Sequence, residues 1–262
     1  MSNKIWNLGF ISQSDFKNHV IKTIQTYADN LESINLERFN KNLIDPIKLT
    51  FDKIVYHSSW EDIIKNEIYR QRDKSNNNSI GYFHQNIFKY IAGCTVPEKG
   101  FDVIYKNPNG ILIDGEKVST INAELKNKHN TMNAGSGKSV YIKLQNGLIN
   151  DNKSLNCLVE AIAKTSQNII WAPCIDGEKV KGHKLIRRIS IDKFYEIVTG
   201  DPTAFYKICM ILPSTIEEIV SNKLTNTPID TVYEELSKQS KKDTDITLAL
   251  YMLGFSSYQG FK

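Results

Sequence analysis

The sequence predicts an α/β protein in which helices flank a mixed central β-sheet, with additional helices at both ends of the chain. Three observations support this prediction. Short runs of β-branched and aromatic residues, separated by turn signals, lie between residues 101 and 128. A similar run over 168–175 follows after an interval long enough for a crossover helix. Apolar residues at helical spacing dominate before residue 92 and after residue 200.

The length of 262 residues suits one large domain with a substantial core. We expect a single domain over 1–262, with a mainly helical N-terminal part over 1–78, a core over 79–190 that carries the candidate site, and a helical C-terminal part over 191–262. The formal charge of +4 permits a polyanionic partner without requiring one. The four cysteines form no Cys-x-x-Cys pair, so we expect core thiols in a reducing cytoplasm. We expect no signal peptide and no membrane span, since no apolar run approaches the roughly 18 residues required.

The N-terminal part reads as helices joined by short turns. Ser12 or Ser14 is placed to cap the first helix, and Pro46 to open a later one. Another helical pattern runs from 60 to 70, and we interpret Arg70, Arg72 and Lys74 as a solvated face. The polar run 74–79 predicts a loop and an internal boundary, and 80–91 predicts a further helix.

The core begins with three short predicted strands. The first covers 101–105, a turn follows over 107–110, the second strand covers 111–113, and Asp114-Gly115 ends it. The third covers 118–128. Because side chains alternate along a strand, Glu124 and Lys126 share one face, roughly 6–7 Å apart.

Glu124, Lys126 and Asp102 form the candidate catalytic group. If the first strand packs beside the third, Asp102 joins the other two, and two carboxylates with a lysine suit metal-assisted hydrolysis. The alternative is a solvated ion pair on a strand face. An acidic residue two positions before a lysine also occurs at Asp15 and at Asp151, in a helical pattern and in a polar loop. Only the pair at Glu124 lies on a predicted strand that follows another strand with an aspartate.

Asp102 followed by Glu124-x-Lys126 after a hairpin resembles the core of the PD-(D/E)XK nucleases. The stretch Gly-Phe-Asp-Val over 100–103, together with Asn-Ala-Glu-Leu-Lys-Asn-Lys-His-Asn-Thr-Met-Asn over 122–133, resembles the type II restriction endonucleases that cut GGNCC and GGWCC sites. The segments 80–85 and 198–206 add to this resemblance, which covers most of the chain. One departure is Phe101, where the superfamily pattern is named for proline.

The resemblance implies a restriction-endonuclease-like fold and a magnesium-dependent enzyme of a bacterial restriction–modification system in the cytoplasm. Asp102 and Glu124, with the backbone carbonyl of Leu125, would hold Mg²⁺, and Lys126 would orient or deprotonate the attacking water. The substrate would be double-stranded DNA with a near-palindromic site, cut by a homodimer to leave 5′-phosphates. The alternatives are a non-catalytic DNA-binding or regulatory module, and a repair or junction nuclease on the same core.

Residues around this group are candidates for its support and for DNA contacts. Gln85, or Glu67 as the nearest upstream carboxylate, could support the site from the preceding helix. The segment Ala134-Gly-Ser-Gly-Lys-Ser139 suggests a phosphate loop, but Met132 stands where that motif requires glycine, so we expect no nucleotide cofactor. An ordinary loop and solvated charge are the alternatives for the DNA candidates. These candidates are Lys128, His129, Asn130, Asn133, Lys138, Lys184, Arg187 and Arg188.

The rest of the chain completes the predicted fold. Leu155, Leu158, Val159 and Ile162 have helical spacing, and 168–175 would be a strand parallel to the third one. Basic residues are densest over 179–188. Helices are expected to start near Asp201 and near Ser214, and a last one to cover 244–255.

Overall fold

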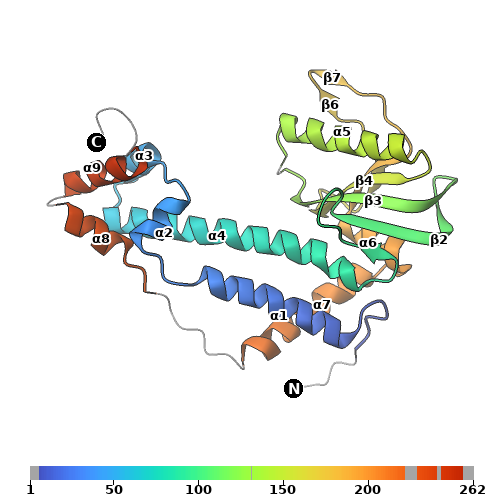
Figure 1. Cartoon of the computed structure of the whole chain (residues 1–262), viewed down its shortest axis with the longest axis horizontal. Coiled ribbons are helices and arrows are strands. Elements are labelled where there is room, and N and C mark those ends of the chain that lie inside the picture. The colour runs from blue at the N-terminus through green and yellow to red at the C-terminus, as the bar shows by residue number, and fades with distance from the viewer. Residues whose placement is uncertain (1–5, 131, 222–228, 241–242, 256–262) are drawn as a thin grey trace. The chain divides into compact units, whose positions relative to one another are not determined.

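The computed structural model describes residues 6–130, 132–221, 229–240 and 243–255 (Figure 1). Contacts within the chain divide it into two compact units. The first unit consists of residues 1–24 and 80–223, and contains the β-sheet. The second consists of residues 25–79 and 224–262, and its described elements are helical. That the chain works as one domain stays a prediction.

A mixed sheet organises the first unit, which agrees with the predicted restriction-endonuclease-like fold. Among the described residues its six strands lie in the order β1, β2, β3, β4, β8, β5. The pairs β1–β2, β2–β3 and β5–β8 are antiparallel, and β3–β4 and β4–β8 are parallel. The strands are β1 (Cys94–Thr95), β2 (Val103–Ile113), β3 (Glu116–Lys128), β4 (Leu155–Ile162), β5 (Asn168–Ile170) and β8 (Ile186–Ser190). A separate hairpin joins β6 (Cys174–Ile175) to β7 (Glu178–Lys179).

The predicted first two strands are one long strand, β2, so the expected turn over 107–110 is wrong. The pairing register of β2 with β3 shifts between Lys106 and Ile111, which makes this stretch a bulge. The Asn107 side chain accepts the Asn109 N–H within the bulge, at 3.0 Å. The turn residues therefore deform the strand without reversing it. Reversal occurs at Asp114-Gly115, where both residues have positive φ.

The predicted helix at Leu155–Ile162 is also wrong, because this segment is strand β4. Its first six residues are all buried. A parallel strand covered on both faces shows a continuous apolar run instead of alternation, and such a run can match helical spacing by chance. The crossover helix is α5 (Ala134–Asn150), and the strand parallel to β3 is β4. The run 168–175 contributes β5, which is antiparallel to β8 at the sheet edge.

Helices complete the first unit. The Ser12 hydroxyl accepts the Asp15 N–H and caps α1 (Gln13–Asn30), as one of the two predicted caps. The helix predicted over 80–91 is the end of α4 (Trp60–Asn86) followed by the 3-10 turn η1 (Ile87–Tyr90). After α6 (Ile191–Thr199), the starts expected near 201 and 214 belong to one helix, α7 (Ala204–Val220), with Pro213 inside it.

The second unit is built from α2 (Leu36–Lys41), α3 (Pro46–Val55), α8 (Val232–Gln239), α9 (Asp243–Gly254) and part of α4. Pro46 opens α3, and α9 matches the predicted last helix. The loop predicted over 74–79 is wrong, since α4 runs through it, although the boundary between the units falls at its end. Arg72 is not solvated: it is 7 % exposed and bonds both carboxylate oxygens of Asp230. Within the described residues, no helix is long and apolar enough to cross a membrane.

Candidate active site

The pairing of β2 with β3 places Asp102 beside the Glu124–Lys126 pair. Val103 of β2 lies opposite Ala123 of β3. One residue earlier, the Asp102 N–H donates to the Ala123 carbonyl at 3.0 Å. The Asp102 carboxylate then accepts the Leu125 N–H at 2.7 Å. This bond ties the aspartate to the middle of the Glu124-Leu125-Lys126 stretch.

Glu124 and Lys126 lie on the same face of β3, as their spacing indicated. Lys126 Nζ donates to Glu124 Oε1 at 2.7 Å. The Glu124 side chain is 11 % exposed and that of Lys126 31 %, so the pair is partly shielded from water. Ile121 and Ala123, on the opposite face, belong to the main apolar core of the first unit. The structure therefore brings Asp102, Glu124 and Lys126 together.

A second lysine, Lys143 of α5, also reaches this site, and the sequence reasoning missed it. Its ammonium donates to Glu124 Oε2, so each oxygen of this carboxylate is bound to a lysine. The same ammonium lies 5.2 Å from the centre of the Phe101 ring. Lys143 comes from a helix seventeen positions after Lys126 in sequence, and no local spacing rule connects the two.

The two carboxylates have opposite pKa shifts. Burial raises the pKa of Asp102, and the nearby Glu124 charge adds to this, while the Leu125 N–H and the two lysines oppose it. Burial also acts to raise the pKa of Glu124, but the hydrogen bonds from Lys126 and Lys143 outweigh it, and the net shift is downwards. Glu124 is therefore held as a carboxylate, and Asp102 is the carboxyl that protonates more easily.

Oxygen donors at this site suit a hard cation. Across the described residues, no three His, Cys, Asp or Glu side chains form a group that could hold a metal ion. Mg²⁺ needs fewer, because it keeps several water ligands and is commonly bound through one or two carboxylates. Asp102, Glu124 and the Leu125 carbonyl offer oxygen only, so the residues present fit Mg²⁺.

The two predicted support residues have different environments. Gln85, at the end of α4, donates from its side-chain amide to the backbone carbonyl of Asp102 at 3.4 Å. Glu67 belongs to the second compact unit, where its carboxylate accepts hydrogen bonds from Arg70 and Gln71. Gln85 is thus the one that contacts the backbone of a candidate catalytic residue.

The polar segment after β3 leads from the site into α5. Lys128 ends β3, and the His129 N–H donates to the Ile162 carbonyl of β4. Asn130 is exposed in the following turn. The Asn133 side chain accepts the Ser136 N–H at 2.8 Å and caps α5, and Lys138 in the first turns of that helix pairs with Asp176.

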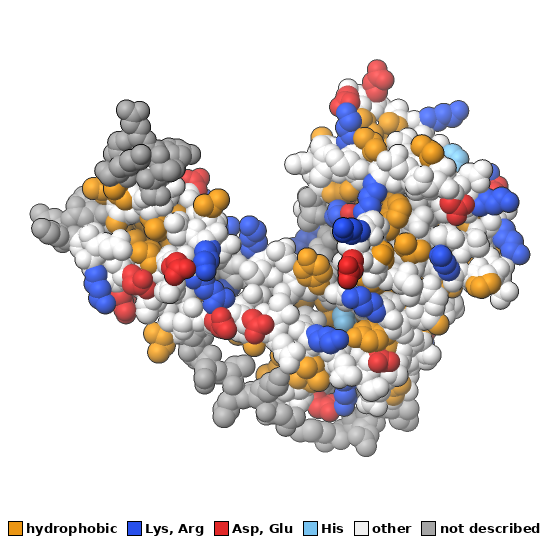
Figure 2. Space-filling view, in the orientation of Figure 1, with side chains coloured by type: hydrophobic (Ala, Val, Ile, Leu, Met, Phe, Trp, Pro, Cys, Tyr) orange, Lys and Arg blue, Asp and Glu red, His pale blue; other side chains and the backbone are white. Residues whose placement is uncertain are grey.

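The basic candidates near β8 are all bound to acidic partners. Lys184 pairs with Glu116. Arg187 is buried and bonds Asp114 and Asn168, whereas Arg188 bonds both carboxylate oxygens of the buried Glu160. Figure 2 shows basic and acidic side chains interspersed over the sheet-containing part of the displayed face. These pairs leave much of the segment's positive charge compensated inside the protein.

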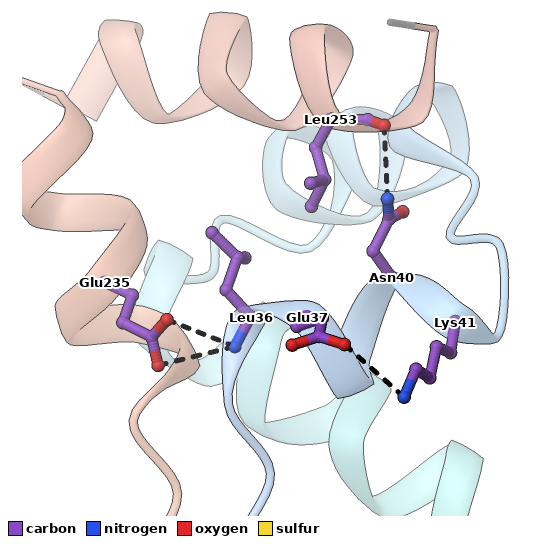
Figure 3. Close-up of a pocket in the computed structure, with 6 residues that line it drawn as sticks. All are labelled: Leu36, Glu37, Asn40, Lys41, Glu235 and Leu253. Carbon is purple, nitrogen blue, oxygen red and sulfur yellow. Dashed lines mark hydrogen bonds and ion pairs between the residues drawn. The ribbon is translucent and has the colours of Figure 1, made fainter.

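A pocket in the second unit has different chemistry (Figure 3). Its volume is about 550 Å³. Glu37 pairs with Lys41, Asn40 donates to the Leu253 carbonyl, and Glu235 accepts the Leu36 N–H. Asn40 and Glu235 bond backbone groups, and the Glu37–Lys41 pair is exposed to solvent, so the pocket is not a candidate for the hydrolytic site.

Comparison with known proteins places the chain among restriction enzymes. The family model described as Eco47II restriction endonuclease matches residues 8–221. The type II restriction enzyme Sau96I of Staphylococcus aureus is 32 % identical over 231 residues, covering 85 % of this chain and 84 % of that protein. The type II restriction enzyme Eco47II of Escherichia coli is 29 % identical over 225 residues, covering 83 % and 90 % respectively.

Proposed function

The chain belongs to the Eco47II restriction endonuclease family and is a type II restriction endonuclease; from this premise we propose that it cuts double-stranded DNA at a short near-palindromic site of the GGNCC kind, with Mg²⁺, leaving 5′-phosphates. One observation carries the assignment of the active site. Asp102, Glu124 and Lys126 meet at the paired ends of β2 and β3, joined by the Leu125–Asp102 and Lys126–Glu124 hydrogen bonds.

Each residue of the site has a separate role in the proposed phosphodiester hydrolysis. Asp102, Glu124 and the Leu125 carbonyl would hold the metal ion, which when bound would activate a water and neutralise charge on the scissile phosphate. The Leu125 N–H fixes the Asp102 carboxylate towards β3. Lys126 orients the attacking water, and as an ammonium it stabilises the negative charge that develops on the phosphate. Lys126 could help to deprotonate that water only from its neutral amine form, after giving its own proton to solvent. Gln85 holds the Asp102 backbone from the end of α4.

A near-palindromic site suits a two-fold homodimer in the bacterial cytoplasm, with each subunit cutting one strand. Of the two adjacent arginines, Arg188 is the better candidate for reading bases. Leu158 pairs with Glu124 on one side and with Arg188 on the other, so Glu124 and Arg188 point to the same face of the sheet. Arg187 points to the opposite face, where it bonds Asp114 and Asn168.

Alanine variants of both arginines test this choice in one salt concentration, because phosphate contacts make every DNA affinity depend on salt. Arg188→Ala is expected to lower the affinity for cognate DNA about five- to a hundredfold more than for random duplex, the range of a lost bidentate contact to guanine. Both variants are expected to lower stability, because Arg188→Ala leaves the buried Glu160 without its cation and Arg187→Ala removes a buried guanidinium. Arg187→Ala is expected to leave the ratio of the two affinities unchanged. Equal ratios in both variants would move the search to Lys128–Asn133.

Digestion of DNA of known sequence tests the activity itself. With Mg²⁺ the protein is expected to give fragments with common ends at one repeated sequence, each carrying a 5′-phosphate. Asp102→Ala, Glu124→Ala and Lys126→Ala should each abolish cleavage, and Lys126→Ala should keep specific DNA binding. Lys153→Ala, from the exposed Asp151-Asn-Lys153 stretch, is the matched control and should cut normally. Cleavage at the normal rate by any of the three site variants would refute the assignment.

Cutting plain duplex also separates the alternatives. A non-catalytic DNA-binding module would bind duplex and leave it intact, and a junction nuclease would cut branched DNA in preference to linear duplex.

A further inference from the structure

We propose that Lys143 is a second lysine of the active site, which neutralises Glu124 while no metal is bound and moves to the scissile phosphate when Glu124 takes a metal ion. The proposal rests on the proposed function, since it assumes that Glu124 is a metal ligand. Lys143 lies on α5, and its ammonium contacts the Glu124 oxygen that Lys126 leaves free.

Close packing of α5 on the sheet gives Lys143 its position. Gly147, one turn further along α5, is buried. A Cβ at Gly147 would overlap the side-chain oxygen of Asn156 and would lie 2.9 Å from Phe101 Cζ. Only a glycine lets the helix come this close. The Phe101 ring then lies against α5 at Gly147 and near the Lys143 ammonium, and it limits where this ammonium can go.

Repulsion between positive charges favours displacement of one lysine when a metal ion binds. Asp102, Glu124, Lys126 and Lys143 together carry no net charge when all are ionised. Both Glu124 oxygens are bound to lysines, so a metal ion that binds Glu124 competes with two ammonium groups for the carboxylate and repels both of them. Lys126 is fixed two residues away on the same strand, whereas Lys143 reaches Glu124 from another element.

A bound phosphate could pair with the Lys143 ammonium once this ammonium has left Glu124. Its side chain is about one-third exposed (34 %), so it has access to bound substrate. A phosphate brought to the metal ligands would place a negative charge within reach of a lysine that has just lost its carboxylate partner. In that position Lys143 stabilises the same developing charge as Lys126, from the α5 side.

Two measurements on Lys143→Met test the two halves of this proposal. Met keeps the unbranched side chain, one atom shorter, and removes its charge. Calorimetric titration of the DNA-free protein with Mn²⁺ is expected to show about three- to tenfold tighter binding, since a cation that competes for Glu124 is gone. Single-turnover cleavage at saturating Mg²⁺ is expected to be about a hundredfold slower, as for the loss of one charge-stabilising donor. Lys143→Arg should restore part of the rate, and Lys153→Met is the charge-matched control.

Each other outcome overturns the proposal. Weaker Mn²⁺ binding by Lys143→Met would make Lys143 a support for the metal ligands, and unchanged cleavage would remove it from the reaction. Circular dichroism identifies a misfolded variant, in which case Lys143→Arg and Lys143→Gln are measured in the same way. If Asp102→Ala is inactive while Lys143→Met behaves as Lys153→Met does, this inference alone fails. If Asp102→Ala also cuts normally, the proposed site itself is wrong.

Discussion

Replacing Gly147 by alanine tests how tightly α5 is fitted to the sheet. Alanine normally stabilises a helix interior, by about 1 kcal/mol relative to glycine. At Gly147 the added methyl would overlap the side-chain oxygen of Asn156 and crowd Phe101. Asn156 cannot give way easily. It is fully buried, its oxygen accepts from Asn122 at 3.0 Å, and its amide donates to the Ser154 carbonyl and hydroxyl.

The costs of overpacking and of lost hydrogen bonds oppose the gain in helix propensity. Their sum decides whether Gly147→Ala raises or lowers the free energy of unfolding. Overpacking a tight contact costs about 1–3 kcal/mol. Displacing Asn156 from its buried hydrogen bonds costs about 1–3 kcal/mol more. Together they exceed the gain of about 1 kcal/mol in helix propensity. We therefore expect Gly147→Ala to lower the free energy of unfolding by about 1–5 kcal/mol.

Urea unfolding followed by circular dichroism measures this change, and Gly137→Ala in the same helix is the matched control. Among the described residues, and apart from its chain neighbours and the backbone of its own helix, no atom lies within 4 Å of a Cβ built at Gly137, so alanine there should raise the free energy of unfolding by up to about 1 kcal/mol. Gly147→Ala should also slow cleavage, because α5 carries Lys143. A Gly147→Ala protein as stable as the unsubstituted one would show that α5 can shift outwards freely, and the close-packing argument would be wrong.

Two further predictions concern buried polar groups. Burial lowers the pKa of His19 to about 4 from an ordinary 6.5, so between these pH values the folded protein keeps the imidazole neutral while the unfolded chain binds a proton. The free energy of unfolding should therefore fall as the pH is lowered from 6.5 to 4. Urea titrations at several pH values should show a less steep fall for His19→Gln. An equal slope in both proteins would contradict this. Asp230→Ala leaves the buried Arg72 with two backbone carbonyls and no carboxylate partner. It should lower the free energy of unfolding in urea by about 3–5 kcal/mol, more than the double variant with Arg72→Met does, and a loss below about 1 kcal/mol would refute the pairing.

The sequence predicted that Asp102, Glu124 and Lys126 lie together because local rules determine this proximity, while their catalytic role stays a prediction. The period of two along a strand puts Glu124 and Lys126 on one face, whatever the rest of the fold. Joining Asp102 to them required the first predicted strand to pack beside the third. In the structure the first two predicted strands are one strand, β2, which pairs with β3 as its hairpin neighbour. The incorrect prediction of a turn over 107–110 did not affect the proximity of these residues. The bulge found there lies beyond the pairing of Val103 with Ala123.

What the sequence did not predict depends on tertiary packing. The apolar residues of β4 match helical spacing, and a helix was wrongly predicted there. Both faces of this strand are buried, and the sequence of the segment alone does not indicate this. Arg72 seemed to belong to a solvated face, but its partner Asp230 is 158 positions away. Lys143 carries no local signal either. Its position depends on how close α5 approaches the sheet, and the only trace of this in the sequence is a glycine one turn later.

Phe101 lies between the Gly147 region of α5 and the Lys143 ammonium. The superfamily pattern is named for proline at this position, and a proline ring has no aromatic face to offer a cation. Here the phenyl ring contacts the Gly147 region of α5 and lies 5.2 Å from the Lys143 ammonium. Phe101, Gly147 and Lys143 therefore form one arrangement: the glycine brings the helix in, and the ring and Glu124 together hold the lysine. A chain with proline at 101 would lack the ring that keeps such a lysine beside the carboxylate, and a lysine at 143 would there be bound by charge alone.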